Sequence, residues 1–224
     1  MRKAPIAALI TGASRGIGKA IKELFEQNGI KVFAPTRDEM DLSSNDSIKK
    51  YISNLDEDID ILVNNAGIND LAGIDEITDE QIQNMLQVNL TSQLQLIRFF
   101  SPSMKKNNYG RIVNIASIWC DFSKERRLLY SIAKSGVKGL TTAAAVELSK
   151  YNVLVNAVAP GFVNTEMTSL NNTPEQIKVL AQALPVKRMA DPKEIAEVVY
   201  FLASDKNTFI TGQTIFADGG FSCV

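Results

Sequence analysis

Short apolar runs rich in β-branched residues alternate along this chain with longer stretches of helical periodicity. The runs are continuously apolar, which is typical of parallel strands buried on both faces. Strand–helix alternation of this kind predicts an α/β fold, a doubly wound parallel sheet with helices on both faces. The predicted strands are Ile6–Thr11, Lys31–Ala34, Ile59–Val63, Arg111–Ile115, Val153–Val158 and Thr214–Ala217.

Three of the helical stretches begin at recognisable capping sequences. Thr78 is followed three residues later by Gln81, which is the spacing of a capping box. Thr173 and Asp191 each precede a proline, with Gln176 or Glu194 at the third helical position. Proline is favoured at the first helical position, so helices are predicted to begin at these points.

Composition limits the classes of function. The 224 residues contain no repeat, low-complexity stretch or linker, so one domain covering residues 1–224 is predicted. With 24 basic and 25 acidic residues, no overall charge attracts nucleic acid or an anionic membrane. No apolar stretch approaches the roughly 18 residues of a membrane span. After the basic start, residues 1–5, the apolar run Ile6–Ile10 is shorter than the roughly 7–15 residues of a signal-peptide core.

Histidine is absent, which excludes Ser–His–Asp and Cys–His mechanisms and most zinc sites, so no metal site is expected. The only cysteines, Cys120 and Cys223, form no CxxC pair and are too few for a disulfide framework. A reduced, cytoplasmic setting is therefore expected.

The connection after the second predicted strand is unusually short. Only three residues separate Arg37 from Asp41. A parallel neighbouring strand at Glu39–Leu42 would need a crossover of roughly a dozen residues. The sheet is therefore predicted to be shortened here, with any strand at Glu39–Leu42 short or irregular.

A glycine-rich loop follows the first predicted strand and leads into a helix. Its glycines are Gly12, Gly16 and Gly18, with Ser14, Arg15 and Ile17 between them. Glycines permit a tight turn and close approach to a pyrophosphate, and the helix N-terminus supplies amide groups and positive charge. The loop predicts dinucleotide binding; the alternative is a structural turn into a helix.

The end of the second predicted strand bears on which dinucleotide is bound. An acidic residue there would hold the ribose hydroxyls of NAD, but the chain has Thr36 followed by Arg37. Arg15 and Arg37 suit the additional phosphate of NADP, because guanidinium groups bind phosphate through paired hydrogen bonds. NADP(H) is therefore favoured over NAD(H). Asp38 weakens this argument, and both arginines could simply be solvated.

Four motifs in this order make the chain resemble the short-chain dehydrogenase/reductase family, whose domains are of the Rossmann type. They are Thr11–Gly18, Asn64–Gly67, Ser117 with Tyr130 and Lys134, and Pro160-Gly161. The resemblance covers nearly the whole chain and is strongest to bacterial 3-oxoacyl-acyl-carrier-protein reductases, notably in Asn156–Thr168 and Asp218–Gly220.

The catalytic candidates are consistent with that resemblance. Tyr130 and Lys134 are four residues apart on a predicted helix and share a face. A nearby ammonium favours the phenolate and is expected to lower the tyrosine pKa from about 10. Ser117 follows a predicted strand and can bond the same carbonyl oxygen, although it could also simply cap a turn. The resemblance implies that Asn89 completes the set by holding a water in a proton relay through Lys134.

The resemblance also implies the remaining contacts to the cofactor. Asn65, Ala66 and Gly67 match the segment beside its adenosine half, and Asp41 and Leu42 match the pair that flanks adenine. Around the nicotinamide, the matching residues are Pro160, Gly161, Val163 and Thr165. Ordinary turn chemistry is the alternative for all of these residues.

The segment before Tyr130 departs from the fatty-acid reductases, which carry a small, glycine-rich stretch there. Its cations, Lys124, Arg126 and Arg127, could bind an anionic substrate such as an acyl-carrier protein, a coenzyme A phosphate or a sugar nucleotide. The alternative, slightly favoured, is a solvated loop or an ion pair between subunits. By resemblance, Thr168–Arg188 forms a mobile lid, and the small residues of Thr141–Val146 pack against a second copy in a dimer or tetramer.

These observations predict an NADP(H)-dependent oxidoreductase acting on a carbonyl or secondary alcohol, small or carrier-linked, with a 3-oxoacyl thioester as the first choice. A reductase of a keto-sugar or sugar nucleotide in bacterial polysaccharide synthesis is the alternative. A non-catalytic NADPH-binding sensor is an alternative of another class. Epimerisation or dehydration of a sugar nucleotide is least favoured, because such relatives usually carry a larger C-terminal domain.

Overall fold

The computed structural model describes residues 6–224, and within them six strands form one parallel sheet. The strand order is β2-β1-β3-β4-β5-β6. Every predicted strand is present, with its ends displaced by two residues at most, and residues 1–5 lie outside the described range. The strands are β1 (Ala7–Ile10), β2 (Lys31–Phe33), β3 (Ile61–Asn64), β4 (Gly110–Ile115), β5 (Val153–Pro160) and β6 (Thr214–Ala217).

Eight α-helices accompany the sheet in the described part of the chain. Capping boxes are present at Thr78, Thr173 and Asp191, as the sequence predicts. None of the helices between residues 6 and 224 is both long and apolar enough to span a membrane. The helices are α1 (Gly16–Gln27), α2 (Asn45–Ser53), α3 (Asp79–Leu86), α4 (Ser92–Lys106), α5 (Leu128–Leu148), α6 (Glu166–Leu170), α7 (Pro174–Ala183) and α8 (Pro192–Ala203).

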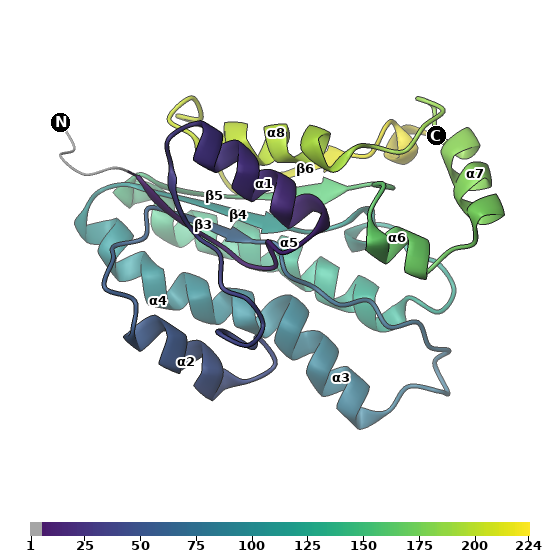
Figure 1. Cartoon of the computed structure of the whole chain (residues 1–224), viewed down its shortest axis with the longest axis horizontal. Coiled ribbons are helices and arrows are strands. Elements are labelled where there is room, and N and C mark those ends of the chain that lie inside the picture. The colour runs from purple at the N-terminus through teal and green to yellow at the C-terminus, as the bar shows by residue number, and fades with distance from the viewer. Residues whose placement is uncertain (1–5) are drawn as a thin grey trace.

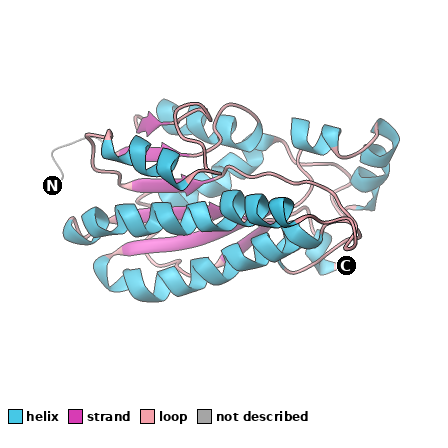
Figure 2. Cartoon of the chain, turned by 90° about the horizontal axis from the view of Figure 1, so that it is seen from below, coloured by secondary structure: helices cyan, strands magenta, loops and turns pink. Residues whose placement is uncertain are grey.

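The two faces of the sheet bury separate hydrophobic cores, because successive side chains of a strand point to opposite faces. Ala8 and Ile10 of β1 pack with α1 and α8, whereas Ala7 and Leu9 pack with α2, α4 and α5. Figure 1 shows α1 and α8 above the sheet and the other three helices below it. Figure 2, seen from below, shows these helices in front of the sheet and running roughly along the strands. The doubly wound prediction is thus confirmed.

The strand order reverses between β1 and β3. β1 pairs with β2 on one side and with β3 on the other, so the carboxyl ends of β1 and β3 are neighbours. In open α/β sheets this reversal opens a crevice in which ligands bind. Here it brings the glycine loop after β1 beside Asn65, which follows β3.

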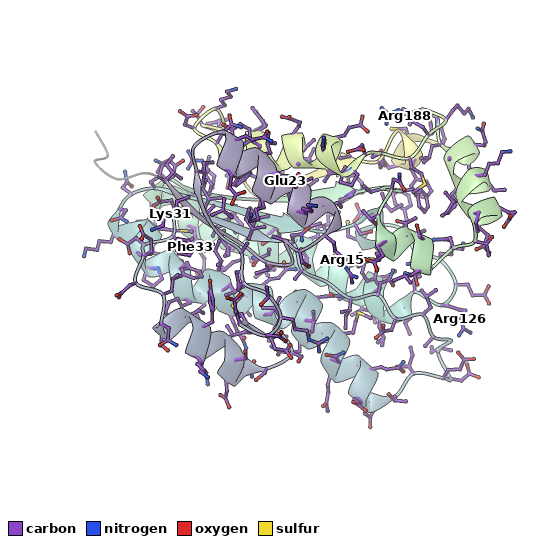
Figure 3. The ribbon with its side chains drawn as sticks, viewed as in Figure 1. Arg15, Glu23, Lys31, Phe33, Arg126 and Arg188 are labelled. Carbon is purple, nitrogen blue, oxygen red and sulfur yellow. The ribbon has the colours of Figure 1, made fainter. Side chains whose placement is uncertain are left out.

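The segment Glu39–Leu42 forms no strand. A turn follows Thr36, and the Glu39 carboxylate accepts hydrogen bonds from the Thr36 amide at 2.8 Å and its hydroxyl at 3.0 Å. Met40 and Leu42 then enter the lower core. β2 is therefore the edge of the sheet, and Lys31 and Phe33 lie on this strand in Figure 3.

Candidate active site

A cavity of about 440 Å³ opens at the carboxyl edge of the sheet. All of the residues predicted to bind the cofactor line it, and so do Ser117, Tyr130 and Lys134. The predicted set is Gly12, Ser14, Arg15, Gly16, Ile17, Gly18, Arg37, Asp41, Leu42, Asn65, Ala66, Gly67, Tyr130, Lys134, Pro160, Gly161, Val163 and Thr165.

The glycine loop is fixed by contacts that no larger residue allows. Gly12 has a φ of +67°, in the left-handed region that favours glycine. A β-carbon at Gly18 would collide with the Gly12 carbonyl oxygen and with the Asn65 side chain. Asn65 Nδ2 in turn donates to the carbonyl oxygens of Thr11 and Gly12, at 2.9 and 3.0 Å. The loop is therefore held against the end of β3.

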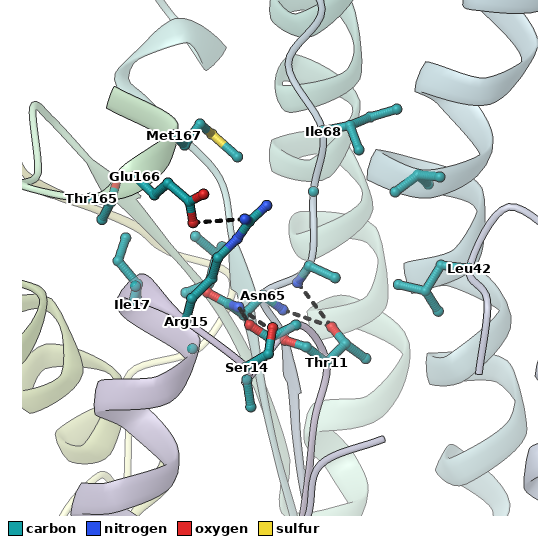
Figure 4. Close-up of a pocket in the computed structure, with 18 of the residues that line it drawn as sticks. Thr11, Ser14, Arg15, Ile17, Leu42, Asn65, Ile68, Thr165, Glu166 and Met167 are labelled. Atoms are coloured by element: carbon teal, nitrogen blue, oxygen red, sulfur yellow. Dashed lines mark hydrogen bonds and ion pairs between the residues drawn. The ribbon is translucent and has the colours of Figure 1, made fainter. Parts of the chain in front are cut away.

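Thr11 contributes a link that was not predicted from the sequence. Its hydroxyl accepts hydrogen bonds from the amides of Asn65 and Ala66, both at 3.0 Å (Figure 4). Its position directly after a buried strand was the available signal. The side chain therefore holds the loop after β1 and the loop after β3 together.

The first turn of α1 fits the pyrophosphate of a dinucleotide. Arg15 is its N-cap residue, but the side chain caps no amide, and the turn contains no acidic residue. A helix N-terminus carries partial positive charge and free amide hydrogens, so it attracts an anion. The glycines leave the space that such an anion would occupy.

Tyr130 lies in the first turn of α5, near Ser117, which follows the carboxyl end of β4. The pKa of its phenol is raised and not lowered, because burial, the largest influence, outweighs the lowering by a side-chain hydrogen bond with Ser117 and by the charge of Arg127. Lys134, which was expected to lower this pKa, is not among these influences, and its Nζ lies 5.5 Å from the centre of the Tyr130 ring. Ser117 also caps a short 3₁₀ turn, since its hydroxyl accepts from the Trp119 amide at 3.3 Å.

Lys134 is itself perturbed. Only 3% of the residue is exposed, and its Nζ donates to the Ile115 carbonyl oxygen at 2.6 Å. Burial lowers the pKa of the ammonium from 10.5 to about 8. A group with this pKa can release and recover a proton near neutral pH.

Asn89 lies just behind the cavity wall rather than on it. Its side chain exchanges two hydrogen bonds of 2.8 Å with the backbone of Ile68, and a β-carbon on Gly67 would lie 3.0 Å from its Oδ1. Asn89 is in a π-helical turn, Gln87–Thr91, at the start of α4. Gln93, fully buried, donates to the Asn89 carbonyl oxygen at 2.8 Å, a contact that the sequence did not reveal.

Both arginines predicted to bind the adenosine end are paired with carboxylates. Arg37 Nε lies 3.5 Å from Asp41 Oδ2 on the loop after β2. Arg15 Nη1 lies 2.7 Å from Oε2 of Glu166, the first residue of α6 (Figure 4). Glu166 was not among the predicted site residues, since it is 151 positions from Arg15 and nothing local connects the two.

The three cations predicted to bind substrate do not line the cavity. Lys124 is exposed, and Arg126 pairs with Glu76 at 2.8 Å, remote from Arg15 (Figure 3). Arg127 is half-buried, with its guanidinium 5.5 Å from the centre of the Trp119 ring. Of the three cations, Arg127 alone influences the pKa of Tyr130, which its positive charge lowers.

Comparison with known proteins agrees with this geometry. Residues 34–222 match the family model described as enoyl-(acyl carrier protein) reductase. The chain is 36% identical to the 3-oxoacyl-[acyl-carrier-protein] reductase of Vibrio cholerae, covering 95% of this chain and 96% of that protein.

Solved structures share this fold over nearly the whole chain. One is a protein of Beutenbergia cavernae, provisionally assigned as an NAD(P)-dependent gluconate 5-dehydrogenase, with NADP bound at low occupancy. Its TM-score is 0.93 at 32% identity, over 99% of this chain and 98% of that one. A 4-hydroxyisoleucine dehydrogenase in complex with NADH has a TM-score of 0.93 at 27% identity, over 98% of this chain and 99% of that one. The chain therefore belongs to the short-chain dehydrogenase/reductase family of NAD(P)-dependent oxidoreductases.

Proposed function

We propose that this protein is an NADP(H)-dependent reductase that interconverts a ketone and a secondary alcohol, with Tyr130 as its acid and base. One observation carries the proposal. Ser117, Tyr130 and Lys134 line the same cavity as the glycine loop. A dinucleotide whose pyrophosphate lies at that loop would extend toward these three side chains.

The bound nicotinamide would supply the hydride. Tyr130 donates its phenolic proton to the carbonyl oxygen of the substrate, and the Ser117 hydroxyl donates a hydrogen bond to the same oxygen. Lys134, with a pKa lowered to about 8 by burial, returns a proton to Tyr130. Asn89 holds a water at the far end of this relay, behind Gly67.

The preference for NADP(H) rests on the adenosine end of the cavity. Arg15 and Arg37 both line it, and Thr36 stands where an acidic residue would hold the ribose of NAD. The Thr36 hydroxyl is bonded to Glu39, which keeps that carboxylate within the turn. The 2′-phosphate of NADP is the anion that the two guanidinium groups would bind.

A 3-oxoacyl thioester is the first candidate substrate, supported by the 36% identity to the Vibrio cholerae reductase over nearly the whole chain. A keto-sugar or sugar acid is the second, supported by the TM-score of 0.93 with the Beutenbergia cavernae protein. The two candidate substrates are chemically distinct, so one assay run with each of them in turn separates the two possibilities.

A cytoplasmic homo-oligomer is part of the proposal. Leu94 and Phe99 of α4 and Ile132 and Val146 of α5 are apolar and 50 to 79% exposed. Apolar surface of this kind on two neighbouring helices suits packing against a second copy.

The test is NADPH oxidation followed by absorbance, with acetoacetyl-coenzyme A and 5-oxogluconate as alternative substrates and NADH in parallel. We expect turnover with NADPH, faster with the thioester, and a loss of at least about 100-fold in Tyr130→Phe, because the proton donor is removed. Binding of NADPH to this variant, measured by fluorescence, stays nearly unchanged.

Tyr151→Phe is the matched control, because Tyr151 lies before β5 at the opposite edge of the sheet, between Lys105 and Lys150. Full turnover by Tyr130→Phe would refute the mechanism. Tight NADPH binding with no turnover of any ketone would instead favour the sensor hypothesis.

A further inference from the structure

The ion pair between Arg15 and Glu166 joins two segments of the cavity wall. Arg15 belongs to the glycine loop before α1, and Glu166 begins α6 on the opposite wall. Nη1 and Oε2 are 2.7 Å apart, and both side chains are more than half exposed. Figure 4 shows the arginine reaching toward the carboxylate.

The two segments also lie close together at Gly16 and Thr165. The Thr165 methyl group would lie 3.4 Å from a β-carbon placed on Gly16. The first turn of α1 provides no acidic residue of its own. The carboxylate that pairs with the arginine of this loop therefore comes from α6.

This pair bears on cofactor recognition, because a phosphate bound by Arg15 would share the guanidinium with the Glu166 carboxylate. Arg15 donates to Glu166 through Nη1, so its other N–H groups can reach a phosphate, but the two anions would then compete for one positive charge and repel each other. Within residues 6–224, Arg37 is the only other arginine that lines the cavity, and it lies beside Asp41. Glu166 thus reduces the additional affinity that the 2′-phosphate gives to NADP(H) over NAD(H).

We propose that Glu166 determines the selectivity between NADP(H) and NAD(H), by competing with the 2′-phosphate of NADP(H) for Arg15. This inference rests on the proposed cofactor site. It concerns the difference in affinity between the two dinucleotides. Loss of a negative charge near the pyrophosphate, by contrast, strengthens the binding of both dinucleotides alike. The ratio of the two dissociation constants therefore isolates the competition.

The experiment is a fluorescence titration of the full chain with NADPH and with NADH, without substrate. In Glu166→Gln, we expect the Kd for NADPH to fall relative to that for NADH by about two- to fivefold, the range that an exposed ion pair is worth. In Arg15→Gln, the preference for NADPH should fall. Adding Glu166→Gln to Arg15→Gln should then change the ratio no further, since a double-mutant cycle reports only the interaction between the two.

Glu175→Gln is the matched control, because it removes the same charge from an exposed position on α7 that does not line the cavity. An unchanged ratio in Glu166→Gln, or an equal change in the Arg15→Gln background, would overturn the inference and leave the proposed function standing. Failure of the unaltered protein to bind either dinucleotide would overturn both.

Discussion

Replacing Lys134 by methionine should change how the stability of the protein depends on pH. Burial lowers the pKa of Lys134 from 10.5 to about 8. Between these two values the unfolded chain binds one proton more than the folded chain, so stability increases with pH. The penalty for burying the charge is therefore complete below pH 8 and is relieved as the pH rises toward 10.5.

The magnitude follows from the two pKa values. Between pH 7 and pH 10, Lys134 should add about 2.5 kcal/mol to the free energy of unfolding. The Lys134→Met variant has no titrating group here, so its stability relative to the unaltered protein should fall by this amount over the same range. Loss of the hydrogen bond to Ile115 shifts the whole curve without changing its slope.

Urea denaturation at pH 7, 8, 9 and 10 measures this effect, with both proteins compared at each pH because other groups titrate as well. Lys106→Met, which removes a positive charge from the exposed end of α4, is the control for net charge. A difference between Lys134→Met and the unaltered protein that stays constant from pH 7 to pH 10 would refute the reasoning.

Two further predictions concern arginines. Arg127→Gln should raise the pKa of Tyr130, so alcohol oxidation, which needs the phenolate, should weaken at neutral pH and its pH profile should shift to higher pH. Arg126→Gln, the control, should leave the pH profile unchanged. An unchanged pH profile in Arg127→Gln would contradict this prediction. Arg111→Met should lower the free energy of unfolding by about 3 kcal/mol, because the buried guanidinium donates to three main-chain carbonyl oxygens. Urea denaturation measures this loss, and weakened cofactor binding would contradict a purely structural role.

Local patterns were sufficient to predict the sheet and the helix starts. The strand at Val153–Pro160 is buried on both faces, and its run of apolar residues, interrupted only by Asn156, already indicates this. The capping box at Thr78 depends on residues three positions apart. The shortened connection after Arg37 could be read from its length alone, because no helix fits into three residues.

Features that depend on distant residues could not be predicted. Arg15 and Glu166 are brought together only by the packing of α6 against the glycine loop. Lys124, Arg126 and Arg127 were predicted to act as one group, because the sequence does not show how they differ in burial and in the residues they contact. The pKa of Tyr130 was expected to be lowered by Lys134, whereas burial of the phenol raises it, and Ser117 and Arg127 offset that rise only in part.

The two ends of the parallel sheet carry residues with different roles. At the carboxyl end lie Tyr130, in the first turn of α5, and the glycine loop; at the amino end, Arg111 ties β4 to Asn152 and Asn207. Mutations that tune selectivity and mutations that threaten folding therefore fall on opposite rims. A lineage built on this plan can change its chemistry by natural variation at one rim while purifying selection preserves the other.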